Sequence, residues 1–98
     1  MGRRKVTVSK SAAESIAAIA WFIESKGMVA TAEKFADSVY DFFVKISNAL
    51  VTHAVCRDKA RASLGLKCLP YKKKYTVVFW ESEKELIIHE FTSSKRIH

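Results

Sequence analysis

The sequence predicts an α+β protein of one domain over residues 1–98: an N-terminal strand, an antiparallel helix hairpin, then a three-stranded antiparallel meander. Residues 5–9 alternate apolar and polar side chains, as a half-buried strand does. Residues 11–51 carry apolar residues at helical spacing, with one short interruption. Residues 64–91 return to β-branched and aromatic composition. Helices and strands segregated along a chain favour the α+β class, with the helices on one face of the sheet.

The first helix is expected over about residues 11–26. Ser11 fits the N-cap, and Glu14 three residues later completes a capping box. The apolar stripe that should face the core consists of Ile16, Ile19, Ala20 and Ile23. Gly27 follows, and glycine is the residue that most often stands just after a helix end.

The second helix is expected to begin at Thr31, an N-cap candidate, with Glu33 in its first turn. It should run to about residue 51, because one apolar face continues through Phe35, Ala36, Val39, Phe43, Ile46 and Leu50. The link between the two helices is only a few residues long. The helices should therefore pack antiparallel as an αα-hairpin.

Residues 52–62 show no clean period and are expected to form a cation-rich loop. The next strand is expected over Leu64–Leu69. Pro70 should end it, because proline has no N–H to donate to a strand ladder.

The sheet should be completed by a central strand and its partner. Tyr75–Trp80 is apolar on both faces, as a central strand is. A polar turn near residues 81–85 separates it from a strand over Leu86–Phe91. If each element reverses the direction of the one before, the first strand lies antiparallel beside the last, which brings the two basic ends together.

The formal charge of +7 is concentrated at the two ends of the chain, while residues 11–50 are mildly acidic. Clustered positive charge favours a polyanionic partner such as RNA, DNA or an acidic protein segment. An excess of charge that serves solubility alone is the alternative.

The two cysteines, Cys56 and Cys68, have no CxxC spacing and no nearby histidine pair, which predicts reduced thiols in a cytosolic protein and no metal site. No signal peptide is expected, because the basic start leads into a strand-like stretch. The alanine-rich run 16–23 is far shorter than the ~20 residues that a membrane span needs. From these three observations we expect a cytoplasmic protein that has no membrane partner.

Three stretches together resemble a known family. The helix pair reads SAAESIAAIAWFIESKGMVATAEKFADSVYDFF, the sheet LGLKCLPYKKKYTVVFW, and the tail IIHEFTSSKRIH. In this order and spacing they resemble the RelE/ParE superfamily of toxins from bacterial type II toxin–antitoxin, or plasmid stabilisation, systems. The resemblance implies a RelE/ParE-like fold over most of the chain, a cognate antitoxin as partner and no cofactor.

The superfamily has two activities on one scaffold. RelE-like members are ribosome-dependent mRNA endonucleases, and ParE-like members bind DNA gyrase. The nucleases typically have an arginine after the aromatic that opens the penultimate strand, but Thr76 follows Tyr75 here. Because charge developing on a phosphate needs a fixed cation, the sequence favours the gyrase-binding branch. An mRNA endonuclease and an inactive, binding-only member are the alternatives, so whether the chain is an enzyme stays open.

The residues assigned to antitoxin or target contact are cations and the aromatics beside them: Lys67, Lys72, Lys73, Lys74, Tyr75, Trp80, Lys95 and Arg96. In a nuclease, the catalytic residues would be Arg96, Lys67 and His98, with His98 as general base toward a ribose 2′-hydroxyl. The structural alternatives are a solvated lysine turn, a frayed terminus and aromatics that cover the sheet.

Helices on one side should leave the other face of the sheet open, and its strands are apolar on both faces. Exposed apolar surface of this kind marks an interaction site. The hypothesis is that an acidic, amphipathic antitoxin segment covers this face and the basic ends. Trp21 and Phe22 belong to the hairpin core or to the rim of a partner site. Whether the chain forms a homodimer is left open.

Overall fold

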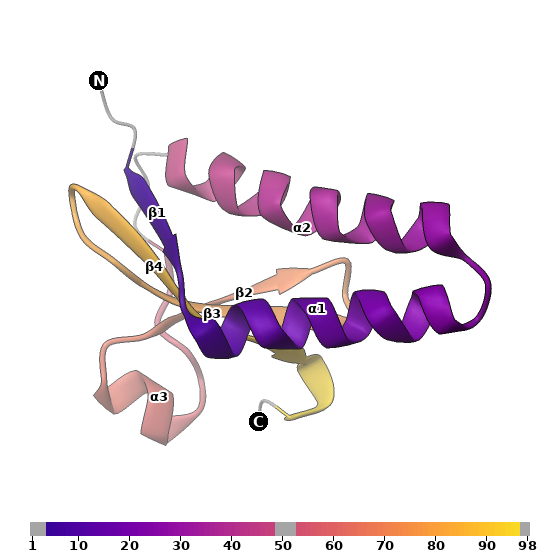
Figure 1. Cartoon of the computed structure of the whole chain (residues 1–98). Coiled ribbons are helices and arrows are strands. Elements are labelled where there is room, and N and C mark those ends of the chain that lie inside the picture. Colours follow the sequence, from indigo (N-terminus) through magenta and orange to yellow (C-terminus); the bar gives the residue numbers. More distant parts are fainter. Residues whose placement is uncertain (1–3, 49–52, 97–98) are drawn as a thin grey trace.

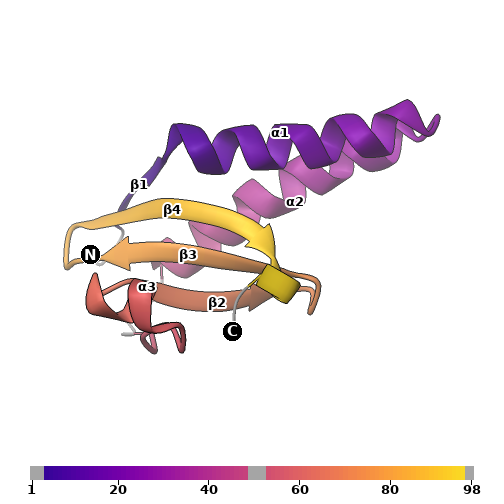
Figure 2. The ribbon, with the colours of Figure 1, turned by 90° about the horizontal axis from the view of Figure 1, so that it is seen from below.

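The structure, a computed structural model, describes residues 4–48 and 53–96 of the chain (Figure 1). Two long helices cover one face of a four-stranded sheet, and a short helix lies on the other face (Figure 2). In chain order the elements are β1 (Lys5–Val8), α1 (Lys10–Ser25), α2 (Val29–Asn48), α3 (Lys59–Ser63), β2 (Lys67–Tyr71), β3 (Tyr75–Glu81), β4 (Glu85–Ser93) and the 3-10 helix η1 (Ser94–Arg96). The predicted α+β order is confirmed.

Helix α1 begins earlier than predicted, because its N-cap is Ser9 and not Ser11. The backbone of Ser9 is extended, and its amide donates to the carbonyl of Ile88 at 2.9 Å as the last step of the strand. Its Oγ accepts the amide of Ala12 at 3.1 Å, which satisfies a free donor in the first turn. At the other end Gly27, with φ of +84°, closes the helix as predicted.

Helix α2 also begins before its predicted N-cap, Thr31. The amide of Ala32 donates to the carbonyl of Met28 at 2.9 Å, so helical bonding starts there. The two helices pack antiparallel, as predicted (Figure 1). The expected end near residue 51 lies outside the described residues.

The sheet has the order β1-β4-β3-β2, and β2, β3 and β4 form the predicted antiparallel meander. The prediction that β1 is antiparallel to the last strand is wrong. Strand β1 pairs parallel with β4, with Lys5 opposite Glu85 and Val8 opposite Ile88, so the sheet is mixed.

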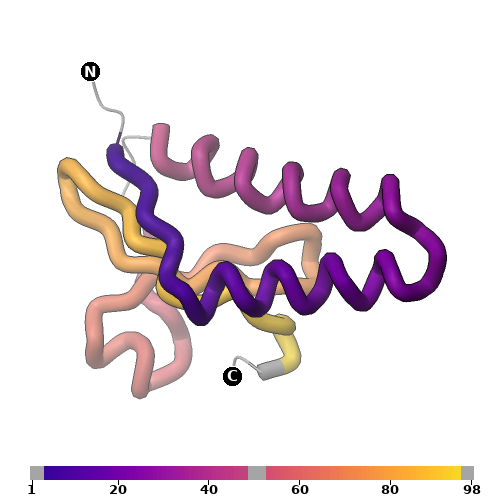
Figure 3. The backbone as a smooth tube through the Cα atoms, viewed as in Figure 1, coloured from indigo at the N-terminus to yellow at the C-terminus, as the bar shows by residue number. Residues whose placement is uncertain are grey.

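The short link between β1 and α1 explains the parallel pairing. Only Ser9 separates the two elements, so α1 continues onward from β1 and does not turn back over it (Figure 3). Helix α2 then returns to the start of β1, where the carbonyl of Ser47 accepts the amide of Arg4 at 3.3 Å. The chain therefore enters β2 at the same end of the sheet as β1, and β4 runs in the direction of β1.

Strand β2 differs from its prediction at both ends. Leu64 and Gly65 close α3, and the strand starts at Lys67. Pro70 lies inside the strand, because β2 is at the edge of the sheet and the missing N–H removes no ladder bond there.

The main core lies between the helices and the sheet. It consists of Ala12, Ile16, Val39, Phe43, Ile46, Tyr71, Val77, Phe79, Leu86, Ile88 and Phe91. A second, small cluster of Cys56, Leu66 and Val78, with Cys68 against it, lies on the other face. The prediction of an open face is therefore wrong in its middle, because residues 53–66 cover the sheet there. No helix in the described part of the chain is long and apolar enough to cross a membrane.

Candidate interaction surface

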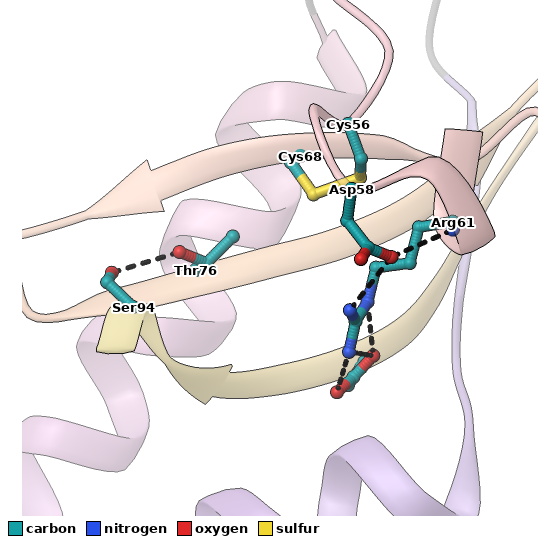
Figure 4. The surroundings of a disulfide bond; sticks show 7 residues. Cys56, Asp58, Arg61, Cys68, Thr76 and Ser94 are labelled. Atoms are coloured by element: carbon teal, nitrogen blue, oxygen red, sulfur yellow. Dashed lines mark hydrogen bonds and ion pairs between the residues drawn. A yellow bond between two sulfur atoms is a disulfide. The ribbon is translucent and has the colours of Figure 1, made fainter. Parts of the chain in front are cut away.

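The segment of residues 53–66, here called the α3 segment, is held on the sheet at two points (Figure 4). The first is a disulfide between Cys56 and Cys68 of β2, with the Cα atoms 4.8 Å apart. The prediction of reduced thiols is therefore wrong for this structure. The two cysteines stand 12 residues apart in the sequence, and no motif in that spacing indicated that the chain brings them together.

The second point is Arg61, which binds two carboxylates. Its Nη2 donates to both oxygens of Glu90 at 2.9 and 2.8 Å, and its Nε donates to Oε1 at 3.0 Å. Its Nη1 donates to Asp58, the N-cap of α3, at 3.3 Å. Hydrogen bonds and charge from Glu90 and Asp58 raise the pKa of Arg61, against the lowering effect of burial. The guanidinium is thus engaged in holding α3 on β4 and is not free for a ligand.

A half-open groove of about 460 Å³ runs between the α3 segment and β2. It is lined by Ala54, Val55, Arg57, Cys68, Leu69, Pro70 and Thr76. Among these described residues Arg57 is the one with a charge. Thr76, which stands where a nuclease of the resembling family would have arginine, is 8% exposed and its Oγ1 lies 2.9 Å from the Oγ of Ser94.

The structure brings most of the predicted cations to one end of the sheet. Lys72, Lys73 and Lys74 form the exposed turn between β2 and β3. The amide of Ser94 donates to the carbonyl of Lys74 at 3.0 Å, which places η1 and its exposed Lys95 beside this turn. We call Lys72, Lys73, Lys74 and Lys95 the lysine cluster.

The backbone of the lysine turn is unusual. Lys72 and Lys73 have φ of 52° and 63°, the left-handed region that glycine and asparagine favour in two-residue hairpin turns. Lysine at both positions costs backbone free energy. The exposed side chains give no packing in return beyond Lys72 Nζ, which lies 5.5 Å from the ring centre of Tyr71.

Two other predicted site residues, Lys67 and Tyr75, lie on the strands on either side of the lysine turn. Alternation along β2 places Lys67 on the helix side with Leu69 and Tyr71, which pack in or against the main core. Tyr75 stacks on Phe91 with ring centres 5.1 Å apart and packs, partly buried, against the core. Its ring centre also lies 5.9 Å from Lys74 Nζ of the lysine turn. Lys67 therefore lies at the far end of β2 from the lysine turn, whereas Tyr75 borders the turn. Their assignment to antitoxin or target contact stays a prediction.

Trp80 is 41% exposed near the opposite end of β3 from the lysine turn. The backbone of Arg96 lies in η1, next to Lys95, but its side chain is outside what the structure describes. His98, the predicted general base, lies outside the described residues altogether.

Two features were missed or left undecided by the sequence. Glu81 accepts the amide of His53 at 2.8 Å, and its Oε2 lies 3.0 Å from the imidazole Nδ1 and 2.9 Å from the Arg4 Nη1. Burial raises the pKa of Glu81, but the hydrogen bonds and the neighbouring charges of His53 and Arg4 outweigh it and lower the pKa. These residues are far apart in sequence, so no local pattern indicates them.

The second feature is the tip of the helix hairpin. Trp21 and Phe22 are 69% and 57% exposed, and Met28 and Val29 next to the turn are exposed as well. This excludes a place in the hairpin core for the two aromatics, and a role at the rim of a partner site stays a prediction. Large aromatic side chains are enriched at protein interfaces.

Among residues 4–48 and 53–96 there is no group of three His, Cys, Asp or Glu side chains that could hold a metal ion. Comparison with protein-family models, with curated proteins and with solved structures found no match to the chain.

Proposed function

We propose that the chain is the toxin of a bacterial type II toxin–antitoxin module of the RelE/ParE kind, which acts in the cytoplasm by binding DNA gyrase and breaks no covalent bond itself. The element order of strand, helix pair and meander supports the resemblance described above. A fold is compatible with several functions, so the choice of mechanism depends on the residues.

One observation carries the choice of a binding mechanism. The position after Tyr75 holds Thr76, a buried hydroxyl that is bonded to Ser94. Arg61 on the same face is bound by Glu90 and Asp58. A neutral hydroxyl and a neutralised guanidinium cannot supply the fixed charge that a phosphoryl transition state needs.

The exposed features favour a protein partner. The lysine cluster offers positive charge at one end of the sheet, and the hairpin tip offers Trp21 and Phe22. Charge of this kind raises the association rate with an acidic surface, while buried aromatics supply most of the affinity. An acidic, amphipathic antitoxin segment that covers such sites would neutralise the toxin.

The alternative is a ribosome-dependent mRNA endonuclease. It is favoured by the groove, since Arg57 and Thr76 line it together and η1 with Lys95 lies close to Thr76. In that case Arg57 would be the phosphate contact that the sequence did not indicate.

Induced expression separates the two. Gyrase binding predicts trapped DNA cleavage complexes and an SOS response, whereas an endonuclease predicts translation arrest with mRNA cut at codon positions. mRNA cuts would overturn the proposal in favour of the alternative. Unchanged growth with folded protein present would leave a binding-only member of the family.

The variant K72N/K73G tests the lysine cluster with little strain on the fold, because asparagine and glycine adopt the positive φ of these two positions more readily than lysine does. Removal of two charges should weaken gyrase association on the order of tenfold, mainly through the association rate. The matched control K59Q/K84Q removes two exposed charges elsewhere and should leave association unchanged. Equal loss in both variants would show that net charge, and not the cluster, matters.

A further inference from the structure

The α3 segment lies on the sheet with little buried surface of its own. None of the α3 residues Lys59–Ser63 is buried. Its contacts with the sheet are the Cys56–Cys68 disulfide, the Arg61–Glu90 ion pair and the small cluster around Leu66 and Val78. At its start, Val55 forms a single backbone bridge to Lys67, and His53 is hydrogen-bonded to Glu81. Glu81 holds His53 in either redox state. Beyond His53, one backbone bridge, a small apolar cluster and one partly exposed ion pair hold the segment weakly, so the covalent bond is the main attachment of residues 54–66.

The main core does not depend on this attachment. Its residues lie on the helix side of the sheet, from Ile16 and Phe43 in the helices to Phe79 and Ile88 in the strands. Val78 faces the other way and belongs to the small cluster. Loss of the disulfide therefore frees one segment and leaves the helix side packed.

We infer that Cys56 and Cys68 form a reversible thiol–disulfide switch, which fixes the α3 segment on the sheet when oxidised and releases it when reduced. The inference goes beyond the proposed function and holds for either target. It rests on the cytoplasmic location that the proposed function assigns, because a disulfide in a reducing compartment is typically transient and regulatory.

The chemistry needs a cellular dithiol as reductant. Cys56 is 4% exposed, whereas Cys68 is partly exposed and lines the groove, so a thiolate reaches the Cys68 sulfur first. Its attack breaks the Cys56–Cys68 bond, forms a mixed disulfide with Cys68 and releases the Cys56 thiolate, which takes up a proton. The second thiol of the reductant then displaces Cys68 as a thiol. Two electrons pass to the protein, and the reductant leaves as a disulfide.

Release of the segment changes the surface of the sheet. Val78, fully buried in the oxidised structure, loses its cover by Cys56 and Leu66. The groove loses the wall that Ala54, Val55 and Arg57 provide. The redox state thus decides whether this face presents a groove beside a basic side chain or an apolar strip of sheet.

Amide hydrogen exchange tests the switch. The reporters are the amides of Cys56 and Leu66, which donate to Leu66 and Arg61 within the segment at 3.0 and 3.1 Å. Their exchange should be on the order of a hundredfold faster in dithiothreitol than after oxidation with a glutathione disulfide buffer. Amides of β4 that bond to β3 should change little. The variant C56S/C68S should behave like the reduced protein in both buffers.

Three results would overturn the inference. Equal exchange of the reporter amides in both states would show that the segment stays in place without the bond. Equal acceleration at all amides, including β4, would identify a permanent structural disulfide and not a local switch. Two free thiols counted by mass after maleimide labelling of the oxidised sample would show that the bond does not form.

Discussion

On the helix side of the sheet, α1 and α2 bury Phe43 against Phe91 and the aliphatic side chains of β3 and β4, whereas on the opposite side the α3 segment buries a small cluster around Val78. The helix side is stabilised by a large apolar area, about 25 cal/mol for each Å² removed from water. The opposite side is held by a disulfide and an ion pair. The first kind of attachment is lost only on unfolding, while a change of redox state or of charge can undo the second.

The largest effect is expected from truncation on the helix side. Phe43 is 1% exposed, so Phe43→Ala should lower the free energy of unfolding by about 3–5 kcal/mol, measured by urea denaturation. Phe22→Ala removes the same ring at a site that is 57% exposed and should cost less than about 1 kcal/mol. Equal costs would contradict the assignment of the core to this side.

An intermediate effect is expected where the two sides meet. Glu81 joins Arg4 before β1 to His53 at the start of the α3 segment, and its side chain is 6% exposed. Glu81→Gln keeps the shape but removes the charge, and should lower the free energy of unfolding by about 2 kcal/mol at pH 7.

The same variant predicts a pH dependence. The pKa of Glu81 is lower in the folded than in the unfolded chain, where its ordinary value is 4.5. Its contribution is therefore fully present above that value and is lost as the pH falls through the folded pKa. Urea denaturation between pH 7 and pH 3 should show the wild type and Glu81→Gln converging in acid. If the difference in unfolding free energy between the two proteins did not change with pH, the charge of Glu81 would not cause the effect. The control is Glu83→Gln, which removes an exposed carboxylate.

The smallest effect is expected on the opposite side. Glu90→Gln leaves Arg61 with Asp58 alone and should cost about 1 kcal/mol in the oxidised protein, because the pair is partly exposed. Thermal unfolding measures this cost. The control is Lys59→Gln, which removes an exposed charge from α3 itself. A loss as large as that of Phe43→Ala would mean that the two sides do not differ as described.

Periodicity was enough to predict the helix hairpin and the meander, because each depends on apolar spacing within one segment. The parallel pairing of β1 depends on the single-residue link at Ser9, which sets a direction that no local pattern contains. The N-caps were placed late for a related reason: Ser9 has an extended backbone and ends the strand while it caps the helix.

The contacts between the α3 segment and the sheet were not predicted, because the residues that form them are distant in sequence. Arg61 and Glu90 are 29 residues apart, and the two cysteines are 12 apart without a motif. The lysine turn was visible as a charge run, but its left-handed backbone was not.

The parallel pairing of β1 with β4 has a mechanical consequence. When a force pulls the two ends of the chain apart, it acts on the start of β1 and the end of β4, which lie at opposite ends of a shared ladder. The hydrogen bonds between the strands then bear the load together in shear. With antiparallel terminal strands, the same force would open the ladder one bond at a time. The chain should therefore resist being drawn by its ends into an unfolding machine better than the predicted antiparallel arrangement would.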